Sequence, residues 1–183
     1  MLIRHADAAR DGPGCAAIYA PFVEDSAVSF EEYAPGAPEL TRRIEEISHH
    51  YPWLVAEDDG ELAGYAYGTE HRRRPAYRWT VEVTIYIAED HRGRGLGRSL
   101  YDALLGLLAR QGLRMAVAGI TLPNPASVAL HEACGFEPIG VYRRVGFKAG
   151  GWRDVGWWQL DLAGGREAAP AEPGPPARLE PLV

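Results

Sequence analysis

The strongest signal in this chain is a glycine- and arginine-rich stretch of nine residues, His91-Arg92-Gly93-Arg94-Gly95-Leu96-Gly97-Arg98-Ser99. Before it, residues 79–87 are rich in Val, Ile, Thr and Tyr, which predicts a β-strand. After it, residues 98–111 have the apolar spacing of a helix that stops at Gly112. Glycines let a backbone come close to a ligand, and the free amides and dipole of a helix start attract anions. The stretch therefore predicts an anion-binding loop between a strand and a helix, and its three arginines add positive charge.

Three interpretations compete for this loop. Its glycines at 93, 95 and 97 lack the spacing Gly-x-Gly-x-x-Gly of a dinucleotide-binding loop, and no acidic residue follows at the expected place. A phosphate loop of the Gly-Lys-Ser/Thr type is also absent from the sequence. A turn with solvated arginines stays open on the stretch alone, so the surrounding sequence must decide.

Length and composition limit the function classes. The chain has 183 residues, 46% hydrophobic and 24% charged, which fits one globular domain. Its net charge of −6 argues against a general binder of nucleic acid or of anionic membranes. Between Arg72 and Arg98, however, there are seven arginines and only three acidic residues, which predicts a specific anionic ligand. The longest apolar run, 103–109, is too short to span a bilayer and the N-terminus has no apolar signal core, so we expect a soluble, cytoplasmic protein.

The cysteines indicate neither a disulfide framework nor a metal site. Cys15 and Cys134 are only two, and their flanking residues show no metal-ligand spacing. We expect both to be small buried residues, and we expect no bound metal.

The rest of the chain alternates between strand and helix patterns. Strands are predicted at 2–5, 53–56, 62–67, 79–87, 115–121, 136–142 and 155–162, and helices at 8–20, 38–50, 98–111 and 124–135. Gly12-Pro13-Gly14 should weaken the first helix, and residues 25–33 should form an irregular loop. This order predicts an α+β fold with a mixed, mostly antiparallel sheet flanked by helices. Residues 1–162 should form the domain, and the Pro/Gly-rich residues 163–183 a flexible tail, or at most a strap along the surface.

The pattern Arg-x-x-Gly-x-Gly from Arg92 to Gly97 resembles the pyrophosphate loop of the GNAT superfamily of N-acetyltransferases, which bind acetyl-CoA. In that superfamily the loop also follows a long central strand and opens a long helix. The next helix there has an Asn-led cap and ends in Gly-Phe, as the segment 124–136 does. The resemblance implies the GNAT acyl-CoA N-acyltransferase fold for the domain and acetyl-CoA as the cosubstrate.

Three further segments look like one subfamily, the phosphinothricin and methionine sulfoximine N-acetyltransferases. They are residues 51–57, 76–82 and 146–160, in which spaced aromatic residues carry the likeness. The resemblance implies transfer of acetyl to the α-amine of a small amino-acid analogue, with resistance to a herbicide-like toxin as the outcome. It also implies a homodimer, with the end of the sheet near the partner subunit.

Acylation of an amine requires a base, because an ammonium group has no lone pair. Glu82 in the strand 79–87 is the best candidate, since burial in an apolar strand would make its carboxylate a stronger base. The alternative is an ordinary strand residue that reaches solvent or pairs with an arginine. His131 stands where many relatives in the superfamily have a tyrosine that protonates the leaving thiolate, and the subfamily also has a histidine there. The alternative for His131 is a surface histidine on an amphipathic helix.

The binding residues are implied by the same resemblance. The backbone at Ile85 and Ile87 should face the cofactor and offer an N–H to the thioester oxygen. The cofactor-binding set is Ile85, Tyr86, Ile87, Arg92, Gly93, Arg94, Gly95, Leu96, Gly97, Arg98 and Asn124. Asn124 should also cap the helix that follows it. The acceptor-binding set is Phe30, Arg72, Arg74, Tyr77 and Tyr86, in which the arginine side chains suit carboxylate and phosphinate groups.

Two other functions stay open on the sequence alone. The same enzyme could act on another small amine, an ordinary amino acid or a protein N-terminus, although the arginines before the strand argue against a polyamine. A non-catalytic acyl-CoA-binding module would bind the cofactor without turnover, and Glu82 argues against it.

Overall fold

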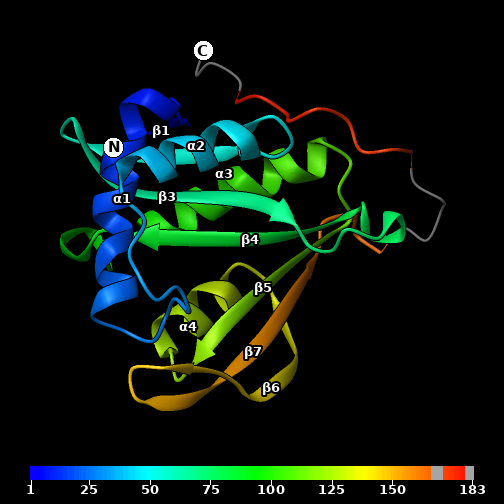
Figure 1. The fold of residues 1–183 in the computed structure, drawn as a ribbon. Helices are drawn as coiled ribbons and strands as arrows, with labels where there is room; N and C mark the ends of the chain where they lie inside the picture. Colours follow the sequence, from blue (N-terminus) through cyan, green and yellow to red (C-terminus); the bar gives the residue numbers. More distant parts are fainter. Residues whose placement is uncertain (166–170, 180–183) are drawn as a thin grey trace.

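One seven-stranded mixed sheet with helices on both faces organises the molecule (Figure 1). The structure is a computed structural model that describes residues 1–165 and 171–179. Its strands are β1 (Leu2–His5), β2 (Trp53–Asp58), β3 (Glu61–Glu70), β4 (Thr80–Ile87), β5 (Met115–Leu122), β6 (Glu137–Lys148) and β7 (Gly151–Asp161). Its helices are α1 (Ala8–Glu24), α2 (Ala37–Ser48), α3 (Leu96–Arg110) and α4 (Pro125–Ala133), with short 3₁₀ turns η1 (Pro75–Tyr77) and η2 (Glu89–His91). The predicted order of elements and the α+β class are confirmed.

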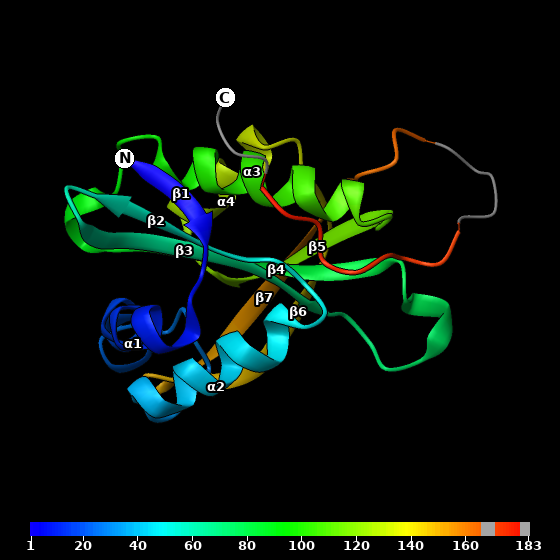
Figure 2. The ribbon, with the colours of Figure 1, turned by 90° about the horizontal axis from the view of Figure 1, so that it is seen from above.

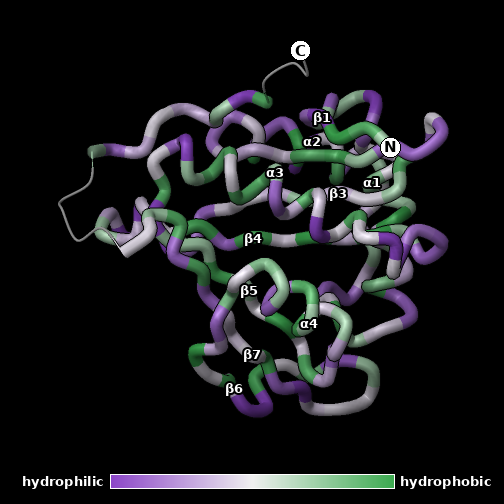
Figure 3. The backbone as a smooth tube through the Cα atoms, turned by 180° about the vertical axis from the view of Figure 1, so that it is seen from behind, coloured by the Kyte–Doolittle hydropathy of each residue, from purple (hydrophilic) through white to green (hydrophobic). Residues whose placement is uncertain are grey.

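The sheet separates two apolar cores. Its strand order is β1-β2-β3-β4-β5-β7-β6, and every neighbouring pair is antiparallel except β4 and β5. Helices α1 and α2 cover one face, while α3 and α4 lie on the other (Figure 2). The larger buried cluster lies under α3 and the smaller one under α1 and α2. Apolar residues accordingly follow the central strands, and hydrophilic ones the outer turns (Figure 3).

The parallel pairing of β4 with β5 is short, and this leaves part of β4 without a neighbouring strand on one side. β4 and β5 pair only from Thr80 to Glu82 and from Met115 to Val117. Beyond that point β5 runs away from β4 with β7 and β6, as Figure 1 shows. The second half of β4 is thus paired with β3 on one side only.

Helix α1 is longer and less interrupted than the sequence predicts. It runs through Gly12-Pro13-Gly14 and ends at Glu24, and Asp7 caps it by accepting a hydrogen bond from the Arg10 N–H (3.0 Å). The predicted weakening is wrong because packing outweighs propensity here. A Cβ at Gly12 would collide with Thr41 of α2, so this glycine lets the two helices approach closely.

The last two strands also extend beyond their predicted bounds, as one long hairpin. Ala149 and Gly150 connect them with φ of 49° and 70°, the positive values that a tight hairpin turn of type I′ requires. A bulge interrupts the pairing between Tyr142 and Gly146, where the Arg144 N–H donates to Asp154 (2.8 Å). The turn and the bulge explain why a simple alternation pattern did not reveal the full strands.

Part of the C-terminal segment lies against the folded domain. The Trp79 Nε1–H donates to the Ala171 carbonyl (2.8 Å), and the Gly174 N–H donates to the Gln111 carbonyl (2.7 Å). Leu179 packs on the larger core. Residues 171–179 therefore form a strap along the surface. Residues 166–170 and 180–183 of the predicted tail lie outside the described residues.

The two cysteines differ in burial. Cys15 in α1 is fully buried, as predicted, and burial raises the pKa of its thiol to about 12. Cys134 at the end of α4 is only half-buried, so the prediction of burial is wrong for it. Among the described residues, no helix is long and apolar enough to cross a membrane, and no cluster of three His, Cys, Asp or Glu residues could hold a metal ion.

Candidate active site

The second half of β4 presents backbone groups that have no strand beside them. The Ala88 N–H donates to the Ala63 carbonyl (2.9 Å), so the alternation of an antiparallel pair also directs the backbone groups of Tyr86 towards β3. The groups of Ile85 and Ile87 therefore point the other way, to the side that β5 has left. This geometry suits the predicted cofactor contact of Ile85 and Ile87, because an extended ligand can pair there like an additional strand.

The predicted anion loop follows β4 and opens α3. Gly93 and Gly95 have φ of 73° and 81°, values that side-chain-bearing residues rarely adopt, and open space surrounds both Cα atoms. Gly95 is the N-cap of α3 and offers no side chain to cap it. The amides of Leu96, Gly97 and Arg98 in the first turn therefore have no carbonyl partner within the helix. A strand, two left-handed glycines and an uncapped helix start together have the geometry that suits a phosphate-like group.

Two of the loop arginines stay close to this opening. The Arg92 guanidinium lies 4.8 Å from the centre of the Phe22 ring, and its Nε–H donates to the Ile87 carbonyl (3.2 Å). Arg94 is exposed at the loop surface. Both positions suit attraction of a polyanionic ligand.

The third loop arginine is bonded inside the scaffold. Arg98 Nε–H donates to Asp102 (2.9 Å), and its Nη1 donates to the Ala133 carbonyl at the end of α4. Gly97 lies so close to Leu130 that an added Cβ would be 3.0 Å from it. These contacts hold α4 against the start of α3. The predicted role of Arg98 in cofactor binding therefore competes with a structural role.

Glu82 lies at the last residue pair before β4 and β5 separate. It stands between Thr69 of β3 and Val117 of β5 in the register. Its side chain is 35% exposed, so the predicted burial of Glu82 is wrong. The carboxylate is instead held by a hydrogen bond between its Oε1 and His71 Nδ1 (2.7 Å). Glu82 is thus accessible to an acceptor and restrained at the same time.

His71 is a site residue that the sequence analysis missed. It follows the end of β3 and its side chain is 14% exposed. Its ring meets Tyr77 and Trp157 edge to face, with ring centres 5.6 Å and 6.2 Å apart. Arg72 Nε–H donates to its second nitrogen, Nε2 (3.3 Å). The only sequence signal was its position beside the arginine run.

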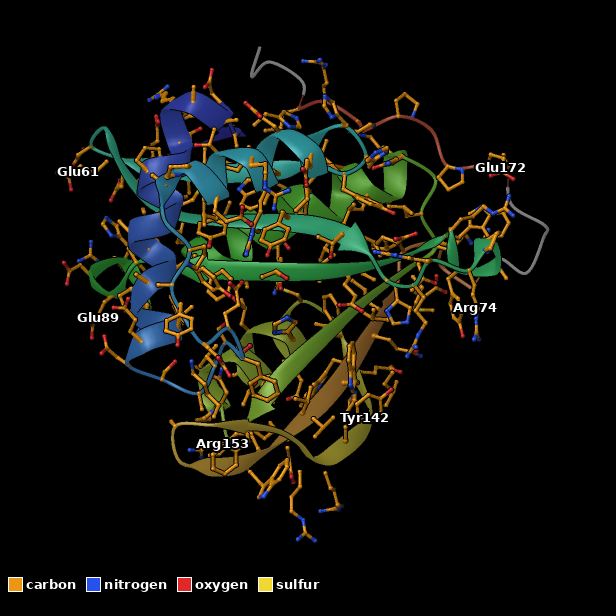
Figure 4. The ribbon with its side chains drawn as sticks, viewed as in Figure 1. Glu61, Arg74, Glu89, Tyr142, Arg153 and Glu172 are labelled. Carbon is orange, nitrogen blue, oxygen red and sulfur yellow. The ribbon has the colours of Figure 1, made fainter. Side chains whose placement is uncertain are left out.

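The predicted acceptor-binding residues are brought together only in part. Arg72 lies 5.8 Å from the centre of the Tyr77 ring, and both reach the Glu82 region through His71. Arg74 precedes η1, and Figure 4 shows it at the right of the view, above Tyr142 of β6.

The other two predicted acceptor residues pack elsewhere on this face of the sheet. Phe30 lies against Gly146 of β6, where an added Cβ would collide with its ring. Tyr86 belongs to an aromatic cluster with Tyr19 and Phe22 of α1, at 4.7 Å and 4.9 Å, and burial raises its pKa well above 10.

Comparison with known proteins fits this geometry. Residues 4–157 match the acetyltransferase (GNAT) domain family. The chain belongs to the GNAT acetyltransferases. It is 43% identical over 162 residues to the phosphinothricin N-acetyltransferase of Streptomyces viridochromogenes, covering 88% of this chain and 84% of that protein. It is 44% identical over 119 residues to an L-methionine sulfoximine/L-methionine sulfone acetyltransferase of Pseudomonas aeruginosa, covering 64% and 69%.

A solved GNAT structure also matches over nearly its full length. The phosphinothricin acetyltransferase of Sinorhizobium meliloti, crystallised with acetyl-CoA, superposes with a TM-score of 0.89. It is 37% identical, and 93% of each chain is covered. The predicted GNAT fold is confirmed, and the loop amides after β4 and the free edge of β4 fit acetyl-CoA as the cosubstrate.

His131 of this GNAT domain is buried, so the alternative of a surface histidine is wrong. It is 3% exposed, and its Nδ1–H donates to the Ser127 carbonyl (2.7 Å). Its Nε2 pairs with the hydroxyl of fully buried Tyr101 (2.9 Å). Burial lowers the pKa of His131, which keeps the ring neutral. A role in protonating the thiolate stays a prediction, because hydrogen-bond partners within the protein occupy both ring nitrogens.

Asn124 acts as the predicted helix cap. Its Oδ1 accepts a hydrogen bond from the Ser127 N–H (3.1 Å) at the first turn of α4. This confirms the structural half of its prediction. Its predicted contact with the cofactor stays a prediction.

Proposed function

We propose that this protein transfers the acetyl group of acetyl-CoA to the α-amino group of a small amino-acid analogue such as phosphinothricin or methionine sulfoximine. The observation that carries the proposal is the position of Glu82, at the point where β4 and β5 separate. The anion loop lies beyond one end of β4, and Arg72 lies near the other. The names of the similar proteins support this substrate class. The outcome would be detoxification of such an analogue, and thus herbicide resistance.

The residues of this chain fit the steps of amine acylation. Glu82 takes a proton from the acceptor's ammonium group, and the free amine attacks the thioester carbon. A C–N bond forms, the C–S bond breaks, and CoA leaves as a thiolate that takes up a proton. A backbone N–H of Ile85 or Ile87 stabilises the oxyanion between these steps. The loop amides and Arg92 hold the pyrophosphate, so that the thioester reaches Glu82 along β4.

The acceptor's charges match the side chains before β4. A glutamate-like phosphinate carries two anionic groups and one amine. Arg72 and Arg74 can bind the anionic groups through paired N–H donors, while Tyr77 supplies an apolar wall. A cationic polyamine would meet repulsion from the same arginines. This charge pattern favours an anionic amino acid as the acceptor.

The outer edge of the sheet supports a homodimer. Six large hydrophobic residues are exposed on the β6–β7 hairpin, Ile139, Val141, Tyr142, Val145, Phe147 and Trp152. A long, apolar edge strand is unfavourable unless another chain covers it. A second copy of this protein, in the cytoplasm where acetyl-CoA is available, is the proposed occupant. Sedimentation equilibrium tests this, since a monomer at micromolar concentration would contradict it.

The substrate class can be tested by thiol release from acetyl-CoA. Phosphinothricin, methionine sulfoximine, glutamate and a short peptide are compared side by side at equal concentration. We expect fast release with one or both analogues and slow or no release with the peptide. Absence of release with both analogues would overturn the proposal, and release with glutamate or the peptide alone would point to a different acceptor. Acetyl-CoA binding without any turnover would indicate a non-catalytic module.

A further inference from the structure

Three side chains form a hydrogen-bonded chain beside the acceptor site. Arg72 Nε lies 3.3 Å from His71 Nε2, and His71 Nδ1 lies 2.7 Å from Glu82 Oε1. The guanidinium nitrogen can only donate, so His71 Nε2 must accept. A neutral imidazole then carries its proton on Nδ1 and donates it to the Glu82 carboxylate. The direction of both hydrogen bonds is thereby fixed.

We propose that His71 is a positioning residue for acetyl transfer, which holds Glu82 in the orientation that removes the proton of the acceptor. This rests on the proposed function, in which Glu82 is the base. With Oε1 bound to His71, Oε2 of Glu82 is the oxygen left for the ammonium proton. A general base must lie within hydrogen-bonding distance of the proton it takes. A carboxylate held in one orientation therefore removes the proton more efficiently than one that rotates freely.

The surroundings of His71 restrict its ring to this arrangement. Tyr77 from η1 and Trp157 from β7 contact the ring edge to face. Tyr142 of β6 lies against Trp157 in turn, with ring centres 5.6 Å apart. Two separate elements thus contact the imidazole ring, and a third supports one of them.

Arg72 connects this row of hydrogen-bonded side chains to the proposed acceptor. Among the described residues, the charged or titratable groups that contact His71 are Glu82 of β4, the adjacent Arg72 and Tyr77 of η1. An imidazolium at His71 would carry N–H groups on both nitrogens and would lose the hydrogen bond from Arg72. It would also place a positive charge near the incoming ammonium. The hydrogen bond from Arg72 therefore belongs with the tautomer that carries its proton on Nδ1 and donates it to Glu82.

The test compares two substitutions of His71 that differ in one donor. His71→Leu removes the donor to Glu82, whereas the side-chain amide of His71→Asn can replace Nδ1–H. We expect His71→Leu to lower kcat roughly 10- to 100-fold, the value of a hydrogen bond to a charged group, without changing the KM for acetyl-CoA. His71→Asn should retain kcat within about threefold. Melting temperatures of both variants show whether they fold as the wild type does.

A double-mutant cycle separates positioning from simple stability. If His71 acts through Glu82, then His71→Leu should cause no further loss of kcat in a Glu82→Gln background. In the wild-type background, His71→Leu should also change the acid limb of the pH–rate profile. A purely structural role of His71 would leave the acid limb unchanged. Equal losses in both backgrounds, or full activity of His71→Leu, would overturn the positioning role.

A second readout keeps this inference distinct from the proposed function. Nitrogen chemical shifts of the His71 ring report its tautomer in the wild-type protein without any acceptor. We expect a proton on Nδ1 in the wild type and a changed ring signal in Glu82→Gln. A proton on Nε2 would contradict the inference even if turnover is normal. Absence of turnover by the wild type would contradict the proposed function instead, while the Nδ1–H signal would still stand.

Discussion

Two arginine-bearing regions flank β4, and they offer different kinds of groups to an anion. Figure 4 labels Arg74 near one end of β4 and Glu89 near the other. After β4, the groups that can hold an anion are backbone amides at the start of α3, with Arg92 and Arg94 beside them, whereas Arg98 is bonded to Asp102 and to the end of α4. Before β4, the groups are side chains, with Arg72 linked through His71 to the candidate base.

This difference indicates which region determines the specificity for acetyl-CoA and which determines the specificity for the acceptor. A backbone site depends on φ values and a helix start, so it recognises a phosphate without regard to the rest of the ligand. A side-chain site depends on which residues surround it, so it can discriminate between acceptors. We therefore expect changes after β4 to affect the KM for acetyl-CoA, and changes before β4 to affect kcat and the choice of acceptor.

The largest effect should come from Glu82→Gln. The variant keeps the shape of the side chain but cannot take a proton, so we expect kcat to fall roughly 10²- to 10⁴-fold. The KM for acetyl-CoA should stay near the wild-type value, as measured by thiol release over a range of acetyl-CoA concentrations. Glu61→Gln, at the exposed first residue of β3, is the matched control and should retain full activity. An unchanged kcat in Glu82→Gln would remove Glu82 from the mechanism.

Gly95→Ala should have the opposite effect, with a higher KM for acetyl-CoA and a nearly unchanged kcat. An alanine at φ of 81° costs about 1–2 kcal/mol, which predicts a roughly 5- to 30-fold higher KM for acetyl-CoA if the loop relaxes without ligand. The KM for the acceptor and the stability of the fold should change little. Gly60→Ala provides the control, because Gly60 has a similar φ of 85° in the β2–β3 turn and open space around it. An equal rise of KM in Gly60→Ala would show that strain alone is responsible.

The contrast also explains what the sequence could predict. The element order and the left-handed turn before α3 followed from residue periodicity and from glycines, whose positions report backbone geometry directly. Gly93, Gly95 and the helix cap Asn124 belong to this class. His71 does not, because only the meeting of the end of β3 with β4 gives it a partner.

Burial was the property that the sequence predicted least well. Glu82 lies among apolar residues in the sequence but reaches the opening between β4 and β5, and is 35% exposed. His131 lies on a helix with a polar surface, but its side chain faces Tyr101 of α3 and is buried. In both cases the tertiary neighbours, which single-sequence patterns cannot specify, decide the exposure.

The smallest effect concerns the scaffold beneath the anion loop. Burial lowers the pKa of His131 below its ordinary value of 6.5, so the unfolded chain binds more protons than the folded one as the pH falls below 6.5. The free energy of unfolding should therefore decrease between pH 7 and 5. Urea titrations should show a shallower decrease of the free energy of unfolding in His131→Gln. Part of the pH dependence should remain in both proteins, because burial also lowers the pKa of His5.

The exposed His49 provides the control for this measurement, because His49→Gln should retain the wild-type slope. Identical slopes in all three proteins would contradict a neutral, buried His131. If the slope changes as expected while the KM for acetyl-CoA at pH 7 does not, His131 supports the fold near the loop without binding the cofactor. A higher KM in His131→Gln would instead show that side chains of α4 take part in acetyl-CoA binding, and the contrast between a backbone site and a side-chain site would need revision.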